Sequence, residues 1–174
     1  MKITKRILCL ALSVMMALGC MSIAAFADDA ASTTKDNSGA IKFSDVGDSE
    51  IYTDAVKTLN LMGVINGYPD GTFKPNDNVT RAEFTAMLMR TLKLGSIGSA
   101  SAAELPFRDV DDNNSDINWA IPNINTAYAR GVINGYEDGT FRPSANVAYE
   151  EAVKMIVCTL GYGANVDVST TPWY

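Results

Sequence analysis

The most ligand-like spacing of side chains in this chain is a run of oxygen-bearing residues at alternate positions: Asp109, Asp111, Asn113 and Ser115. Alternating carboxylate and amide oxygens are the pattern with which a loop surrounds Ca²⁺. A calcium loop of the common helix-loop-helix type also needs glycine at its sixth position and glutamate at its twelfth, where this chain has Asn114 and Ala120. We therefore interpret the run as a solvated acidic loop and predict no metal site.

The chain contains no histidine, which excludes several kinds of active site. It lacks the commonest general base, the usual zinc ligand and any Ser-His or Cys-His pair. Of its three cysteines, Cys9 and Cys20 lie in the apolar N-terminal segment, and Cys158 lies among apolar residues near the C-terminus. We interpret Cys158 as a small buried core residue, so the fold must depend on apolar packing rather than on a disulfide. We predict no catalytic residue, no cofactor and no enzymatic activity.

A block of seventeen residues occurs twice in the chain. It reads GVINGYPDGTFKPNDNV at residues 63–79 and GVINGYEDGTFRPSANV at residues 131–147, 68 positions later. A shorter motif precedes each block, Phe-Ser-Asp-Val at residues 43–46 and Phe-Arg-Asp-Val at residues 107–110. Repetition at such a period indicates one supersecondary unit used more than once, in which no unit buries its apolar face alone.

Apolar residues at helical spacing predict one helix before each block and one helix after it. Gly63 ends the first helix, and Thr80 with Glu83 has the spacing of a capping box at the start of the second. Pro122 belongs in the first turn of the third helix, which places its start near Trp119. The fourth helix lacks a capping hydroxyl, so we expect its start to fray. The predicted buried faces are Tyr52, Ala55, Val56, Leu59 and Met62; Phe84, Met87, Leu88, Thr91 and Leu92; Ile121, Ile124, Ala127 and Tyr128; and Ala152, Met155, Ile156, Thr159 and Leu160.

The N-terminus has the features of an export signal. A basic start, an apolar run and the sequence Ala-Phe-Ala before Asp28 predict that residues 1–27 are a signal peptide. A cut before Cys20, which would produce a lipoprotein, is the alternative. The apolar run is short for a membrane-spanning helix, so we expect an exported chain with no membrane segment after cleavage.

Cleavage would make the chain more acidic, because the leader holds three of the 14 basic residues and none of the 20 acidic ones. The net charge then moves from −6 to about −9, which argues against nucleic acid and anionic lipid as partners. We expect the following division: signal peptide 1–27, flexible lead-in 28–40, first repeat 41–94, linker 95–106, second repeat 107–161, and a tail 162–174 whose Pro-Trp-Tyr end is like the opening of a truncated third repeat.

The order of motifs resembles the S-layer homology (SLH) family. Phe-Ser-Asp-Val, the loop Gly-Tyr-Pro-Asp-Gly-Thr-Phe-Lys-Pro and Thr-Arg-Ala-Glu follow one another here, and residues 41–161 carry the resemblance. It implies a mainly α fold in which tandem helix-loop-helix repeats pack as a helical bundle. Members usually have three repeats that form a pseudo-threefold prong, which would be incomplete in this chain.

The resemblance also implies a function, the noncovalent anchoring of an exported protein to the bacterial cell wall. The partner would be a secondary cell wall polysaccharide, which often carries an acidic pyruvate ketal, and the protein would lie at the cell surface or in an S-layer. The residues that the family's binding pattern implies here are Asp45, Gly67, Arg81, Asp109, Trp119 and Gly135, with Arg142 as a further cation.

These residue types suit an acidic sugar. Arg81 at a helix start offers a planar fork to a carboxylate, and the helix N-terminus adds amide donors. Asp45 and Asp109 can accept hydrogen bonds from sugar hydroxyls, and Trp119 can stack on a pyranose ring. Glycines in the loops let the backbone approach a ligand closely.

The two repeats differ at positions that this function would use. Tyr149 stands where the first repeat has Arg81, and Ile51 stands where the second has Trp119. Trp119 and Arg81 could therefore complement each other in one groove between the repeats, or one groove works and the other is degenerate. Arg142 could replace the missing arginine only if its loop points inward.

Several residues also have a structural interpretation. Asp70 and Asp138 are expected to stabilise their own turns. Asp45 and Asp109 could equally cap a turn or face a sugar. Two other functions stay open: a module that pairs with another SLH chain to complete a prong, and a fragment of a larger surface enzyme.

Overall fold

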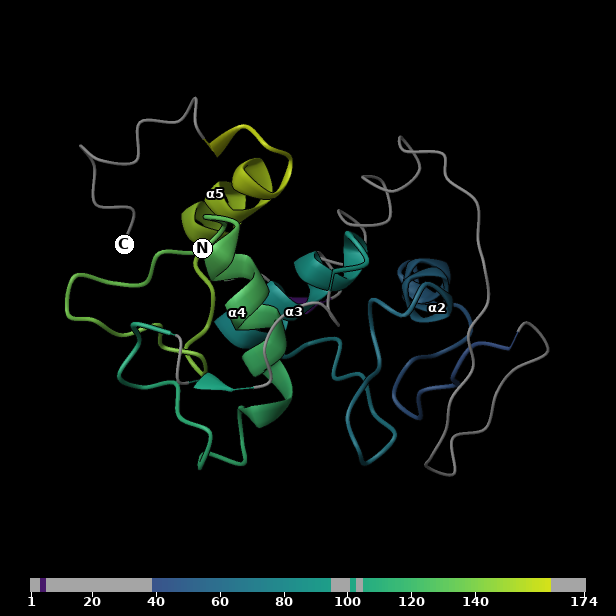
Figure 1. The fold of residues 1–174 in the computed structure, drawn as a ribbon. Helices are drawn as coiled ribbons and strands as arrows, with labels where there is room; N and C mark the ends of the chain where they lie inside the picture. The colour runs from purple at the N-terminus through teal and green to yellow at the C-terminus, as the bar shows by residue number, and fades with distance from the viewer. Residues whose placement is uncertain (1–3, 6–38, 95–100, 103–104, 164–174) are drawn as a thin grey trace. The chain divides into compact units, whose positions relative to one another are not determined.

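The structure of the chain, a computed structural model, describes residues 4–5, 39–94, 101–102 and 105–163 (Figure 1). Most of the predicted signal peptide, the Gly/Ser/Ala-rich part of the linker and the Pro-Trp-Tyr tail lie outside these residues. The described residues are mainly helical, as the sequence predicts, and an isolated β-bridge joins Thr80 and Asn146. None of the helices within the described residues has the length and apolarity needed to span a membrane.

The chain divides into two compact units, one formed by Thr4–Asp77 and one that contains the residues from Asn78 onward. The boundary falls after the first loop, so the second helix of the first repeat belongs to the unit of the second repeat. The units therefore do not coincide with the sequence repeats. As a result, Arg81 of the first repeat belongs to the same unit as the loop of the second repeat.

The unit Thr4–Asp77 is organised around helix α2, Thr53–Leu61. Val56 and Leu59 on its inner face are almost completely buried, as their spacing predicts. The helix ends at Leu61 with Met62 as its C-cap, and Gly63 follows with a φ of 72°, the left-handed conformation expected of a glycine that terminates a helix. The loop then folds back over the helix, where Phe43 packs against Phe73 with ring centroids 5.7 Å apart.

The loop of the first unit is a tight turn held by its own polar groups. The amide of Tyr68 donates to the carbonyl oxygen of Thr72 at 2.8 Å. The carboxylate of Asp70 accepts from the Thr72 amide at 3.0 Å, so the predicted turn-stabilising role of Asp70 is confirmed. The loop of the second unit repeats both bonds with Tyr136, Asp138 and Thr140.

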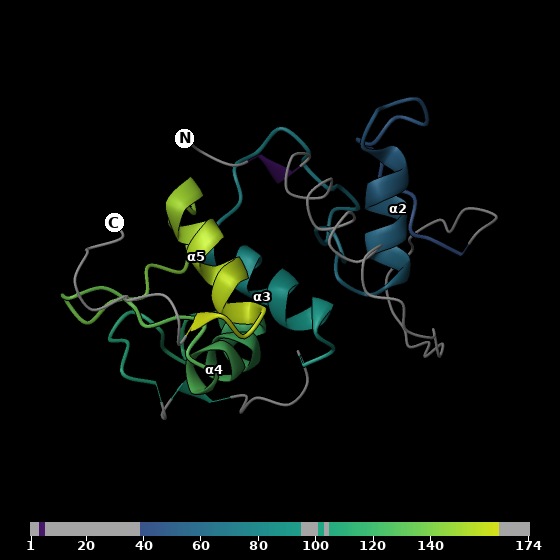
Figure 2. The same cartoon turned by 90° about the horizontal axis from the view of Figure 1, so that it is seen from above.

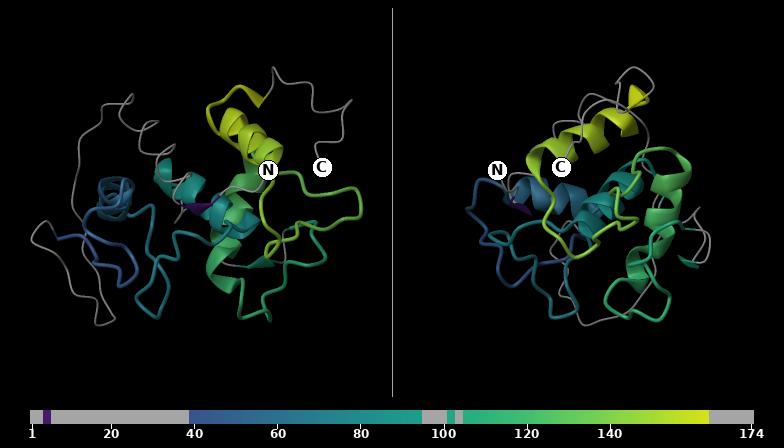
Figure 3. Two further views of the ribbon diagram at one scale, coloured as in Figure 1. Left: turned by 180° about the vertical axis from the view of Figure 1, so that it is seen from behind. Right: turned by 90° about the vertical axis from the view of Figure 1, so that its left-hand side faces the viewer.

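The second unit contains α3 (Arg81–Thr91), the 3-10 helix η2 (Asn118–Ala120), α4 (Ile121–Ala129) and α5 (Tyr149–Thr159). Figures 1 and 2 show α3 beside both α4 and α5, and Figure 3 shows the same helices from two other directions. Packing on two sides buries nearly the whole of α3 up to Met89, including Phe84 and Leu88 at 0% exposure. This helix therefore forms the centre of its unit.

The predicted helix starts agree with the structure. Thr80 accepts from the Glu83 amide at 3.2 Å and Glu83 accepts from the Thr80 amide at 2.8 Å, a complete capping box. Pro122 lies in the first turn of α4, directly after η2. The start of α5 keeps half of the box, because Glu151 accepts from the amide of Ala148 at 2.9 Å.

The predicted burial fails at the C-terminal ends of the helices, where Met62, Leu92, Tyr128 and Leu160 are exposed, and at Cys158. Leu160 is 51% exposed although it continues the predicted apolar face of α5, and Cys158 is half-buried instead of buried. Met155 and Ala152 on the same helix are buried against α3, as predicted. The difference arises because α3 packs against both α4 and α5, whereas among the described helices α5 packs against α3 alone.

Candidate functional site

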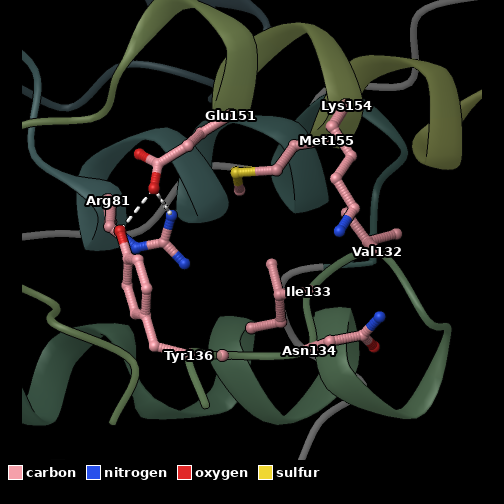
Figure 4. Close-up of a pocket in the computed structure, with 9 residues that line it drawn as sticks. Arg81, Val132, Ile133, Asn134, Tyr136, Glu151, Lys154 and Met155 are labelled. Carbon is pink, nitrogen blue, oxygen red and sulfur yellow. Dashed lines mark hydrogen bonds and ion pairs between the residues drawn. The ribbon is translucent and has the colours of Figure 1, made fainter. Parts of the chain in front are cut away.

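A small recess opens where the loop of the second repeat meets the helices of its unit (Figure 4). The loop supplies its floor, α5 one wall, and the first residue of α3 another. The lining residues are Arg81, Val132, Ile133, Asn134, Gly135, Tyr136, Glu151, Lys154 and Met155. Its volume is about 40 Å³. A site for one water needs roughly 10–15 Å³, so the recess admits a group of about three heavy atoms, such as a carboxylate, rather than a sugar ring.

Arg81 is the main cation of this recess, and it is only 6% exposed. Its Nε donates to the carbonyl oxygen of Phe141 at 2.8 Å, and its Nη1 lies 3.0 Å from Oε1 of Glu151. The guanidinium also lies over the rings of Tyr136 and Phe141, 4.7 and 4.9 Å from their centroids. Since a guanidinium has five N–H donors, these contacts fix the plane of the side chain and leave donors directed toward the recess.

Glu151 connects the recess to the start of α5. Its Oε2 caps the Ala148 amide, while its Oε1 faces Arg81 and accepts a hydrogen bond from the hydroxyl of Tyr136. Burial and the neighbouring Glu151 carboxylate raise the pKa of Tyr136 to about 12. The phenol therefore stays protonated at neutral pH and continues to donate to Glu151.

Lys154 is the second cation of the recess, and the sequence analysis did not identify it. Figure 4 shows its side chain on the side of the recess opposite Arg81 and Tyr136. Lys154 projects from α5, one turn after Glu151. Two cations and one carboxylate give the recess a net charge of about +1 in a strongly acidic protein. Comparing the two repeats could have identified Lys154, because the first repeat has Ala86 at the equivalent position and the lysine is therefore not required by the repeated fold.

Asp45 and Asp109 are used by their own loops. The two carboxylate oxygens of Asp45 accept from the amides of Phe73 and Lys74 at 2.8 and 2.6 Å. Asp109 repeats this with Phe141 and Arg142, both at 2.7 Å. Each aspartate thus joins the short motif before the first helix of its repeat to the end of the loop. Neither lines the recess.

Gly67 and Gly135 are required by packing and by backbone conformation. Their φ angles are 72° and 75°, a region that side chains rarely tolerate. A Cβ at Gly135 would meet the ring of Phe107 and lie 2.9 Å from the Thr140 carbonyl oxygen, and a Cβ at Gly67 would meet the equivalent groups. Gly135 also lines the recess, to which it contributes backbone atoms.

Trp119 lies away from Arg81. The indole is 47% exposed, its Nε1 donates to the carbonyl oxygen of Asp116 at 3.0 Å, and Arg90 lies 6.0 Å from its ring centroid. Arg90 is at the C-terminal end of α3 and Arg81 at the N-terminal end, so the two arginines are roughly 13 Å apart along the helix. The structure therefore does not bring Trp119 and Arg81 into one groove of this unit.

Arg142 folds over the outside of the loop. Its guanidinium lies 3.9 Å from the ring centroid of Tyr136, and its Nη2 is 3.0 Å from Oδ2 of Asp138. Hydrogen bonds from Thr140 and Arg142 lower the pKa of Asp138 to about 2, so the pair is charged at neutral pH. Arg142 is exposed and does not replace the arginine that the second repeat lacks.

The acidic run at residues 109–115 stabilises its own loop. Asp109 binds backbone amides, and Oδ1 of Asp111 accepts from the amide and the side-chain nitrogen of Asn113 at 3.0 and 2.8 Å. No group of three or more acidic or cysteine side chains within the described residues could hold a metal ion.

Comparisons with known proteins agree with the repeated motifs. The family model described as S-layer homology domain matches residues 42–85 and 106–153, more than half of the chain. A cellulosome-anchoring protein of Acetivibrio thermocellus is 37% identical over 125 residues, which cover 71% of this chain and 27% of that protein. A surface layer protein of Brevibacillus choshinensis is 32% identical over 64% of this chain and 10% of its own length.

Some of the relatives are named as enzymes. An endoglucanase of a Bacillus species is 37% identical over 78% of this chain, but the match covers only 13% of the enzyme. The chain therefore spans about a quarter or less of the length of these three curated relatives.

Proposed function

The chain belongs to the S-layer homology domain family, and on that basis we propose that it anchors an exported protein to the bacterial cell wall by binding secondary cell wall polysaccharide. Cell-surface anchoring as such follows from the family and from relatives that are named as anchoring and surface layer proteins. The module itself is non-catalytic, and relatives such as the endoglucanase match it over a small share of their length. The polysaccharide and its acidic substituent are the proposal.

The recess beside Arg81 is the observation that supports a polysaccharide ligand most directly. It contains Arg81 and Lys154 on opposite sides and one carboxylate, in a chain whose net charge is −6. The guanidinium of Arg81 is held by Glu151 and two aromatic rings, so its plane is preorganised to bind a carboxylate. A partly buried cation also binds an anion more strongly than a fully solvated cation does.

The size of the recess suggests which part of a polysaccharide enters it. About 40 Å³ accommodates a carboxylate with its attached carbon, as in a pyruvate ketal, while the sugar ring would stay outside. The exposed amide of Asn134 at the rim can exchange hydrogen bonds with a sugar hydroxyl. In this arrangement Arg81 and Lys154 bind the acidic substituent and the loop backbone near Gly135 contacts the ring.

A sedimentation assay with purified cell walls tests the proposal. Residues 28–174 are mixed with sacculi before and after acid extraction of the secondary polysaccharide, and the bound fraction is measured after centrifugation. We expect binding to intact walls only, and competition by released polysaccharide that still carries its acidic substituent. Equal binding to extracted walls, or no binding by a folded chain, would reject the polysaccharide as the ligand.

A further inference from the structure

The second helices of the two repeats, α3 and α5, differ in burial at equivalent positions. Positions 68 residues apart are equivalent in the two repeats, so Tyr149, Val153 and Ile156 on α5 correspond to Arg81, Thr85 and Leu88 on α3. The three α3 residues are at most 6% exposed, in a unit where α3 packs against both α4 and α5. On α5, Tyr149 is 51% and Val153 is 41% exposed, and Ile156 is half-buried. At the C-terminal end of the same face, Leu160 is 51% exposed.

The covered face of α3 shows which contacts a partner of α5 would make. The amides of Arg81 and Ala82 donate to the carbonyl oxygens of Ala145 and Pro143, at 2.9 and 3.0 Å. The guanidinium of Arg81 lies over the ring of Tyr136, and at the other end of the helix Arg90 faces Trp119. The second helix of one repeat thus binds the first helix and the loop of the following repeat.

The chain carries a second copy of that receiving surface, in the unit Thr4–Asp77. Its loop has Tyr68 where the second loop has Tyr136, and Asp77 where the second loop has Ala145. The structure shows that this surface accepts a backbone segment in the same way. The amide of Lys5 donates to the Asp77 carbonyl oxygen at 3.3 Å, and the Lys5 ammonium lies 4.4 Å from the ring centroid of Tyr68.

Lys5 therefore occupies, on the first loop, the place that Arg81 occupies on the second. The predicted signal peptide, residues 1–27, includes Lys5, so cleavage removes this contact from the exported chain. The exported chain then has both a helix face with no described partner, on α5, and an equivalent receiving surface on α2 and the first loop.

We propose that two copies of the exported chain associate head to tail, with α5 of one copy packed on α2 and the first loop of the other. The equivalences assign the contacts. Tyr149 would lie on Tyr68 of the second copy, and its amide would donate to the Asp77 carbonyl oxygen. Cys158 would face Ile51, which takes the place of the Arg90 and Trp119 pair.

The pair of Cys158 and Ile51 supports the view that the two surfaces are chemically complementary. In the covered interface a cation faces an aromatic ring, whereas in the proposed one both residues are apolar or weakly polar. Ile51 is 86% exposed, so burial against Cys158 and its apolar neighbours on α5 removes unfavourable apolar surface from water. Because the interface joins two different surfaces, copies can close into a ring or continue into a longer assembly.

Analytical ultracentrifugation of residues 28–174 over a concentration series tests the association. We expect the mass to rise to at least twice that of one chain, and Val153→Arg to restore the single-chain mass at every concentration. Ala129→Arg places the same side chain at an exposed helix position outside the proposed interface and should leave the mass series unchanged. A single-chain mass throughout, or no effect of Val153→Arg on a folded protein, would overturn the proposal.

Cross-linking between single-cysteine copies tests the assigned contact. An affinity-tagged Ile51→Cys, Cys158→Ser copy is mixed with the unmodified chain, whose only cysteine after cleavage is Cys158. The equivalent contact within the chain joins two long side chains, Arg90 and Trp119. The backbones at Cys158 and Ile51 should therefore lie too far apart for a disulfide, so a short bismaleimide is used as the cross-linker. We expect a covalent heterodimer, much more of it than with a tagged Glu137→Cys, Cys158→Ser control.

Equal heterodimer yields from Ile51→Cys and the control would reject this contact. The Ile51→Cys chain that retains Cys158 provides the remaining comparison. If it cross-links only within single chains, α2 of the same chain covers α5 and the two-copy assembly is wrong. Wall binding can succeed or fail independently, because the recess that contains Arg81 lies within one unit of one chain.

Discussion

The two loops of this chain have nearly the same internal structure but different surroundings. In both, a tyrosine amide bonds a threonine carbonyl oxygen at 2.8 Å, and an aspartate from the preceding motif accepts two amides. The second loop faces Arg81, which comes from the first repeat, whereas the first loop faces Lys5 from the predicted leader. The repeat thus determines the structure of the loop, and the segment that precedes the repeat supplies the cation that faces it.

This comparison changes how the exchange of Arg81 for Tyr149 is understood. The sequence suggested that the second repeat lacks a cation of its own. The structure shows that the recess at the second loop takes its arginine from the helix of the first repeat. Tyr149 instead lies on the exposed face of α5. The exchange of arginine for tyrosine therefore changes the exposed surface of α5 and leaves the recess at the second loop intact.

Replacing the two equivalent residues should show the largest difference between the repeats. Arg81→Ala leaves Glu151 buried without its cation, and loss of one partner from a buried pair lowers the free energy of unfolding by about 3–5 kcal/mol. Tyr149→Ala should change it by less than about 1 kcal/mol in dilute solution, because the side chain is half exposed. Urea denaturation of both variants measures the difference, and equal losses would contradict the assigned contacts.

Glycine substitutions in one loop should separate packing from backbone strain. Gly135→Ala combines a positive φ with contacts to Phe107 and the Thr140 carbonyl oxygen, so we expect a loss of about 2–4 kcal/mol. Gly139→Ala has the same φ of 75° in open space and should lose about 1 kcal/mol. Thermal unfolding compares the two. Similar losses would mean that the Phe107 ring yields to the added methyl group.

Exchanging the residues before α3 and α5 should give smaller changes of opposite sign. Thr80→Ala removes a hydroxyl that accepts from the Glu83 amide, and such changes cost about 1 kcal/mol. Ala148 has a φ of −78° and a ψ of 158°, close to the −78° and 161° of Thr80. Ala148→Thr should therefore complete the second capping box and stabilise the protein by up to about 1 kcal/mol. Chemical denaturation measures both changes, and a destabilised Ala148→Thr variant would refute the equivalence.

The smallest effect concerns the titration of Tyr136. Its pKa is raised from 10.0 to about 12, so the neutral phenol is favoured in the folded protein. Its contribution to stability is complete below pH 10 and is lost as the pH rises through about 12. A tyrosinate absorbance titration should contain a late step that disappears in Tyr136→Phe. Ionisation of all folded-state tyrosines near pH 10 would contradict the hydrogen bond to Glu151.

The elements that the sequence predicted correctly depend on local signals. Gly63, Pro122 and the pair Thr80 and Glu83 mark helix ends through backbone conformation and hydrogen bonds within a few residues. Asp70 likewise acts within its own turn. These interactions require no knowledge of which helices later meet, so composition and spacing were sufficient to predict them.

The site could be predicted only in part because it depends on packing between repeats. Arg81 and Gly135 do line the recess, but Lys154 was missed because a lone helix lysine is usually solvated. Trp119 lies at the opposite end of α3 from Arg81, which only the antiparallel packing of α3 and α4 determines. Whether Asp45 and Asp109 also contact a sugar remains a prediction, since each already accepts two loop amides.

The most direct test of the polysaccharide site uses Lys154, whose replacement leaves the pair of Arg81 and Glu151 intact. Titration calorimetry compares the affinity of released wall polysaccharide for the unmodified chain, for Lys154→Ala and for Lys42→Ala. Lys42 is an exposed lysine of the first repeat with one surface ion pair, so its replacement removes the same charge. We predict about a tenfold loss of affinity for Lys154→Ala alone, equivalent to roughly 1.4 kcal/mol. Unchanged affinity, or equal losses in both variants, would contradict a site at the recess.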